Sequence, residues 1–132
     1  MKVSIEKQSD GSFIAYNTTG DFVTLLGTGA TVEDAKSDFV TSFNVIKESY
    51  SSRGDFMPEE LTEDIEFNFD VSSLFEYYSM FNVSALARYL GINESLMRQY
   101  KGGATYVSDK QIEKIESGMR KLGTELAALR IH

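Results

Sequence analysis

Apolar residues recur every three or four positions between residues 32 and 50, and this stripe constrains the fold of the first half of the chain. Such spacing places them on one side of an α-helix. Thr31 is expected to cap the helix through its hydroxyl, and Gly54 to end it. A helix with one apolar side must cover another apolar layer, so we expect it to pack on a sheet. The stripe consists of Val32, Ala35, Phe39, Phe43, Ile46 and Tyr50.

Alternation of apolar and polar residues predicts strands on both sides of this helix. Val3 and Ile5 alternate with polar neighbours, which is the period of a half-buried strand. Asp10-Gly11 follows and predicts a hairpin turn, because glycine adopts positive φ at low cost. Further strand patterns cover residues 12–17, 22–29 and 65–69. The predicted order for this part of the chain is therefore β-β-β-α-β.

Charge is distributed unevenly along the 132 residues, whose total is −7. Residues 1–70 hold five basic and 14 acidic side chains, a net charge of −9, whereas residues 71–132 hold eight basic and six acidic ones, a net charge of +2. This asymmetry indicates two modules with different partners; a solvated acidic loop around Pro58 is the simpler alternative. We expect an α+β chain with a sheet-plus-helix domain at 1–70, a connecting helix at 71–81 and an all-α domain at 82–132.

Composition excludes several classes of protein and site. The chain has no cysteine, which excludes a disulfide framework, a thiolate nucleophile and a cysteine zinc site. No apolar run approaches the roughly 20 residues of a membrane span, and residues 1–10 lack a signal-peptide pattern. We therefore expect a cytoplasmic protein without membrane contact, cofactor or metal.

The placement of Ala87, Gly91 and Met97 predicts two helices joined by a tight turn. Asn82 and Asn93 are the expected N-caps of the two helices. A small residue is needed where the helices cross closely, a glycine permits the left-handed turn between them, and an apolar residue anchors the second helix. This spacing resembles the DNA-binding helix-turn-helix; a generic helical hairpin is the alternative.

If the second helix enters the major groove, its exposed side reads the DNA. Arg98 suits guanine and Gln99 suits adenine, each through paired hydrogen bonds. Lys101, beside Gly102-Gly103, suits a phosphate. The predicted DNA-binding residues are Glu94, Ser95, Arg98, Gln99 and Lys101.

Three neighbouring positions have alternative roles. Asn93 is expected to cap the helix rather than contact a base. Glu94 either accepts from cytosine or simply faces solvent, since it would repel phosphates. Tyr106 either contacts a phosphate or packs into the domain.

The sequence after residue 107 predicts a long last helix. Ser108 and Gln111 form a capping box, and apolar residues then follow at near-heptad spacing. We expect a core role at the start of the stripe and a contact with a second subunit towards residues 122–131, giving a homodimer or homotetramer; Gly118 and Gly123 weaken a long coiled coil. The stripe consists of Ile112, Ile115, Met119, Leu122, Leu126 and Leu129.

The first half resembles the HicB antitoxin family. The resemblance rests on the Asp10-Gly11 turn, on Gly27 and Gly29 at the end of a short strand, and on Thr31-Val32-Glu33-Asp34-Ala35 at the start of the helix. It implies a truncated ribonuclease-H-like fold without nuclease activity, which masks a small basic HicA-like ribonuclease toxin. Where the family commonly has Pro-Gly-Cys, this chain has Thr19-Gly20-Asp21-Phe22.

These features together predict the antitoxin of a type II toxin–antitoxin system, which neutralises a small ribonuclease toxin and represses its own operon by binding operator DNA. The alternative is a stand-alone repressor that responds to a small ligand. A metal-dependent nuclease is a third hypothesis, but the spacing of Asp10, Asp21 and Asp70 gives no reason for convergence on two cations. Turn and capping roles explain Asp10 and Asp70, and the terminal His132 is poorly placed for catalysis. We expect no enzymatic activity.

Overall fold

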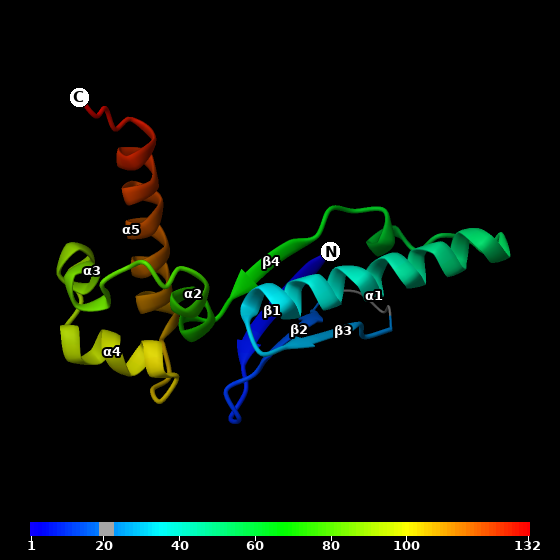
Figure 1. Ribbon diagram of the computed structural model, residues 1–132, viewed down its shortest axis with the longest axis horizontal. Helices are drawn as coiled ribbons and strands as arrows, with labels where there is room; N and C mark the ends of the chain where they lie inside the picture. The colour runs from blue at the N-terminus through cyan, green and yellow to red at the C-terminus, as the bar shows by residue number, and fades with distance from the viewer. Residues whose placement is uncertain (19–22) are drawn as a thin grey trace. The chain divides into compact units, whose positions relative to one another are not determined.

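A computed structural model describes residues 1–18 and 23–132, and the chain divides into two compact units, Met1–Tyr77 and Tyr78–His132. Over these residues the fold is mixed α+β, with one four-stranded sheet and five α-helices (Figure 1). The division after Tyr77 falls within the connecting segment expected at residues 71–81. The reason is local: helix α2 (Val71–Tyr77) is capped by Asp70, and its last residue stacks on Phe69 with ring centroids 5.6 Å apart. The helix of the expected connecting segment therefore belongs to the first unit.

The sheet of the first unit has the strand order β3-β2-β1-β4. Strand β1 (Lys2–Lys7) pairs antiparallel with β2 (Phe13–Asn17), and β2 pairs antiparallel with β3 (Leu26–Gly29). Strand β4 (Glu66–Phe69) returns on the other side of β1 and runs parallel to it. The third strand begins later than its sequence pattern predicted, and residues 19–22 lie outside the described residues.

Local chemistry explains the turn between β1 and β2. Gly11 has a φ of 86°, and the Asp10 carboxylate accepts hydrogen bonds from the Ser12 amide at 2.9 Å and the Ser12 hydroxyl at 2.6 Å. These two bonds lower the pKa of Asp10, with the hydroxyl bond as the larger cause. The hairpin turn expected from Asp10-Gly11 is confirmed.

Helix α1 (Val32–Arg53) covers one face of the sheet (Figure 1). The Thr31 hydroxyl accepts from the Asp34 amide at 3.1 Å, and Gly54 ends the helix in the left-handed conformation. Both ends are therefore those predicted. The side of the helix that faces the sheet buries Val32, Ala35, Phe39 and Phe43 against Val3, Ile5, Phe13 and Ala15.

Helix α1 lies directly against the edge strand β3. A Cβ added to Gly27 would lie 2.4 Å from the Phe39 nitrogen, so only glycine allows this approach. The Asp38 carboxylate accepts from the Thr28 amide at 2.8 Å, and the Ser42 hydroxyl donates to the Leu26 carbonyl at 3.2 Å. Side chains of α1 thus form hydrogen bonds with backbone groups along the outer edge of β3.

The second unit contains three helices among its residues 78–132: α3 (Val83–Leu90), α4 (Glu94–Gly102) and α5 (Asp109–Ala127). The Ser108 hydroxyl caps α5 by accepting from the Gln111 amide at 3.3 Å. A Cβ on Gly118 would lie 2.1 Å from a methyl carbon of Leu90, so α5 approaches α3 closely at this glycine. The described helices include none with the length and hydropathy needed to cross a lipid bilayer.

Candidate nucleic-acid interface

The packing of α3 on α4 rests on three positions. Ala87 and Met97 are fully buried, which lets the two helices approach closely. Between the helices, Gly91 has a φ of 73° and its N–H donates to carbonyls at the end of α3, including that of Ala87. Residues with a β-carbon rarely adopt this conformation. Ala87, Gly91 and Met97 therefore have the packing and turn roles that their spacing predicted.

Both helices begin at asparagine caps. The Asn82 side-chain oxygen accepts from the Ala85 amide at 3.0 Å, and that of Asn93 accepts from the Leu96 amide at 3.0 Å. Asn93 is therefore used as a cap, as expected, rather than as a base-contacting group. Its position fixes the start of α4, so that Glu94 and Ser95 lie in the first turn.

The predicted DNA-binding residues share the exposed side of α4. Ser95, Arg98, Gln99 and Lys101 are exposed and Glu94 is half-buried. The opposite side of the helix buries Met97 and Tyr100. Burial of that side fixes the rotation of α4, and hence which side chains face solvent.

Neighbouring hydroxyl groups hold two of these side chains. The Arg98 guanidinium donates to the Ser84 hydroxyl on α3 at 2.9 Å. The Gln99 side-chain oxygen accepts from the Thr105 hydroxyl, which follows α4, at 2.9 Å. Both side chains therefore lie over the surface of the unit, and their remaining N–H groups can bind other acceptors.

Glu94 forms an ion pair with Arg88 of α3. Sequence reasoning named Glu94 but overlooked Arg88, whose side chain is 65% exposed. The pair neutralises the acid that would otherwise repel a phosphate at the start of α4. The two residues are six positions apart and lie on opposite sides of the turn, so the periodicity of neither helix predicts the ion pair.

The segment after α4 exposes an aromatic ring. Tyr106 is 84% exposed, so of the two roles expected for it, packing into the domain is not realised. Lys114 of α5 donates to the Gly91 carbonyl at 2.8 Å and thereby ties α5 to the turn between α3 and α4. Sequence reasoning missed this lysine, because the pair is 23 residues apart.

The second unit is moderately basic. It holds eight basic and five acidic side chains, a net charge of +3.

The Tyr89 hydroxyl on α3 donates to the Glu125 carboxylate on α5 at 3.1 Å. Desolvation, and then the bond to Glu125, raise the pKa of Tyr89 above its ordinary value.

Burial varies along the apolar stripe of α5. Ile112, its first member, is 42% exposed, Ile115 is buried, and Met119 and Leu122 are half-buried. Leu126 is 54% exposed, and Leu129 and Ile131 beyond it are 61% and 88% exposed. Ile115 is therefore the member of the stripe that lies in the core of this unit, the expected core role does not extend to Ile112, and the end of the stripe is exposed among the described residues.

The candidate carboxylates of the first unit have structural roles. Asp10 closes the hairpin, and Asp70 caps α2 by accepting from the Ser73 amide at 2.7 Å. Asp21 lies outside the described residues. Among the described residues, no three histidine or acidic side chains are grouped so that they could hold a metal ion.

Comparisons of this chain with protein-family models, with curated proteins and with solved structures returned no match.

Proposed function

We propose that the chain is an antitoxin and transcriptional repressor, whose second unit binds operator DNA and whose first unit binds a small basic toxin. The observation that carries the DNA-binding half is the α3–α4 pair: two capped helices joined at left-handed Gly91, with Arg98 and Gln99 exposed on the second. This arrangement supports a helix-turn-helix in which α4 is the recognition helix.

The exposed side of α4 supplies groups of two kinds. Arg98 and Gln99 recognise guanine and adenine edges in the major groove, after exchanging their bonds to Ser84 and Thr105 for bonds to the bases. Ser95 and Lys101 bind phosphate oxygens on either side. Arg88 offsets the charge of Glu94, which allows the start of α4 to approach the backbone.

The end of the α5 stripe supports assembly of two or more copies. Leu126 is an exposed apolar residue in the last turn of α5, and Leu129 and Ile131 are exposed just beyond the helix; pairing with the same segment of a second copy removes them from water. A homodimer presents two copies of α4 to a two-fold-related operator, and a homotetramer presents four.

The first unit supplies the acidic surface for a toxin. The net charge of residues 1–70 is −9, which favours encounter with a basic protein. The resemblance to HicB antitoxins supports the same role, with a HicA-like ribonuclease as the partner and cytoplasm as the place of action.

The operator proposal is tested with the DNA upstream of the gene and the full chain. Arg98→Ala combined with Gln99→Ala should weaken binding by roughly 10²-fold or more, because each bidentate base contact contributes about 1–3 kcal/mol. Lys121→Ala, which removes an exposed charge from α5, is the matched control and should have a small effect. Unchanged binding of the double variant would refute α4 as the recognition helix.

The toxin proposal is tested by co-expression with the product of an adjacent short basic open reading frame. Co-purification of the two proteins supports the antitoxin. A chain that binds its upstream DNA but captures no neighbouring product is the stand-alone repressor.

A further inference from the structure

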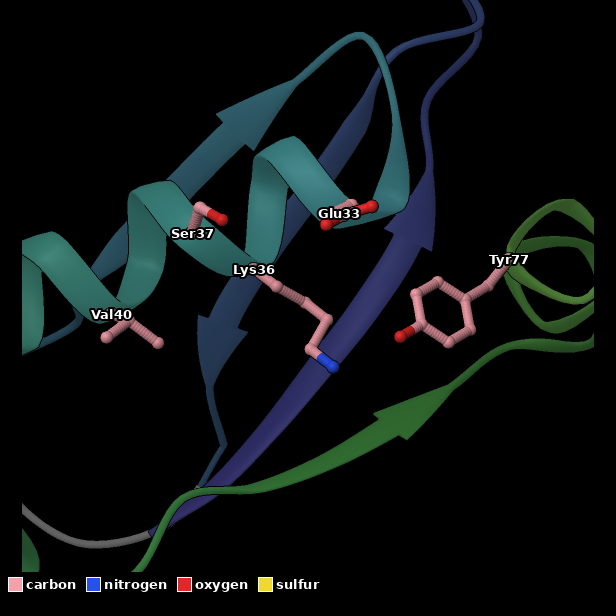
Figure 2. A pocket seen from close by; sticks show the side chains of 5 residues that line it. All are labelled: Glu33, Lys36, Ser37, Val40 and Tyr77. Carbon is pink, nitrogen blue, oxygen red and sulfur yellow. The ribbon is translucent and has the colours of Figure 1, made fainter.

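The sheet of the first unit has two edges, and within residues 1–18 and 23–132 side chains bond to the backbone of one of them. At β3, Asp38 and Ser42 of α1 bond to backbone groups of Thr28 and Leu26. At the other edge lies β4, the last strand in the order β3-β2-β1-β4. Figure 2 shows β4 as the strand beyond β1, on the side to which Lys36 extends.

The register of β4 decides which backbone groups face outward. The Glu66 and Asp70 amides donate to the Met1 and Ile5 carbonyls, at 2.9 and 3.1 Å. Alternate residues of a parallel strand turn their N–H and C=O groups to the same neighbour. Phe67 therefore directs its N–H and C=O away from β1, and so does Phe69. Within residues 1–18 and 23–132, these groups have no hydrogen-bond partner.

We propose that the β4 edge is a docking site for an extended basic strand of a partner protein, which joins the sheet beside Phe67 and Phe69. Such strand addition gains affinity from main-chain hydrogen bonds and specificity from alternate side chains. In the proposed antitoxin the partner is the toxin, and that identification rests on the proposed function. The geometry of the edge does not depend on it.

Charge selects the partner. Residues 54–70, which lead into and form β4, hold seven acidic side chains and no basic one. Glu66 is exposed on the strand itself. A second copy pairing at this edge would place acidic strands side by side, which is destabilising. A basic strand brings opposite charge to the same positions.

The two faces of β4 differ, and this predicts a partner strand in which apolar and basic residues alternate. Phe67 faces α1, since its ring meets Phe39 edge-on at 6.2 Å, and Phe69 faces the same way. Glu66 and Asn68 are exposed on the other face. Directly opposed side chains on paired strands lie about 4.5–5.5 Å apart. Apolar residues of the added strand therefore lie on the side of β4 where Lys36 and Tyr77 already contact Phe67 and Phe69, and basic residues lie beside Glu66.

A hollow lined by both charged and apolar side chains lies on the α1 side of β4. It has a volume of about 390 Å³ and is lined by Glu33, Lys36, Ser37, Val40 and Tyr77 (Figure 2). The Lys36 ammonium lies 4.8 Å from the centre of the Phe67 ring and 5.1 Å from that of Tyr77. The hollow therefore adjoins the α1-facing side of β4.

The probe for this site is a labelled nine-residue peptide of alternating lysine and valine, mixed with the full chain. Amide hydrogen exchange is followed by NMR. In the free protein, Phe67 and Phe69 should exchange rapidly, whereas Asn68 and Asp70 should be protected. Saturating peptide should slow exchange at Phe67 and Phe69 by about tenfold or more, because their amides become hydrogen-bonded. Unchanged exchange at these two amides would overturn the proposal.

Affinity measured by fluorescence anisotropy separates strand pairing from simple charge attraction. Glu66→Lys should weaken binding by roughly tenfold through charge reversal, and Glu48→Lys, at an exposed position on α1, should not. Methylation of alternate peptide nitrogens should weaken binding by about tenfold, because it removes main-chain donors. Equal affinity of the methylated peptide, equal affinity of the Glu66 variant, or no binding at all each contradicts the site.

The same exchange measurement separates this site from the proposed function. If the neighbouring gene product co-purifies but leaves Phe67 and Phe69 unprotected, the antitoxin stands and the β4 site is wrong. If no toxin co-purifies but the peptide protects both amides, the site stands for another basic partner.

Discussion

Replacing Gly27 with alanine tests how directly α1 rests on β3. The added Cβ would lie 2.4 Å from the Phe39 nitrogen, 2.5 Å from the Ala35 oxygen and 2.7 Å from the Phe39 α-carbon. All three are backbone atoms, so rotation of a side chain relieves none of the contacts. Helix α1 must move outward by about 1 Å to reach normal carbon separations of about 3.5 Å.

The expected cost has two parts. Overpacking of this kind costs about 1–3 kcal/mol. Movement of α1 also stretches the bonds from Asp38 to Thr28 and from Ser42 to Leu26, each contributing about 1 kcal/mol. We therefore expect Gly27→Ala to lower the free energy of unfolding of the first unit by about 3–5 kcal/mol, a large fraction of the stability of a typical domain.

Urea unfolding of the full chain, followed through NMR signals of β1 and β2, measures this loss. Gly123→Ala is the matched control, because Gly123 lies in α5 with open space around its β-position. That variant should stabilise the second unit by about 0.5–1 kcal/mol through helix propensity. If Gly27→Ala shifts the first unit by less than about 1 kcal/mol, close contact between α1 and β3 is not what requires glycine there.

Three further predictions concern the second unit. Asn93→Ala should lower its free energy of unfolding by about 1 kcal/mol through loss of the α4 cap, measured by urea unfolding; no change would mean that the bond to the Leu96 amide contributes nothing. Replacing both Leu126 and Leu129 with glutamate should convert the oligomer to folded monomer in analytical ultracentrifugation, and an unchanged mass would exclude this stripe as the interface. Desolvation, and then the bond to Glu125, raise the pKa of Tyr89, so folding is favoured more strongly below pH 10.0, the ordinary tyrosine value, and this advantage is lost as pH rises through the higher pKa of the folded state. Because the pKa of Tyr16 is raised as well, spectrophotometric titration should show two late tyrosines, and Tyr89→Phe should remove one of them; loss of a tyrosine that titrates in the ordinary range would contradict the bond.

Local signals predicted most of the secondary structure because each depends on few neighbouring residues. The caps at Thr31, Asn82, Asn93 and Ser108 all accept the expected backbone N–H. A cap is a short-range hydrogen bond between a side chain and an amide three residues on, so its pattern is visible in the sequence. The same holds for Gly91, whose left-handed conformation follows from its place between two helices.

Contacts between segments far apart in the chain were harder to predict from the sequence. The sequence indicated a fourth strand at residues 65–69, but its parallel position beside β1 depends on pairing across more than 60 residues. Likewise, exposure of Arg98 and Gln99 follows from the apolar side of α4, whereas their hydroxyl partners, Ser84 and Thr105, lie on other segments. Periodicity identifies the side of a helix that faces solvent and leaves the partners of each exposed side chain undetermined.

The modest charge of the second unit links its two proposed surfaces. A net charge of +3 supplies few phosphate contacts, so one copy gains little affinity that is independent of sequence. Specific contacts from a single α4 are also few, because Arg98 and Gln99 are the long polar side chains suited to bases on its exposed side. Two copies joined through the end of α5 convert binding of the second half-site into an intramolecular step, which raises affinity without adding contacts to either copy. The exposed end of α5 is therefore as necessary to the proposed repressor as the residues that would contact DNA.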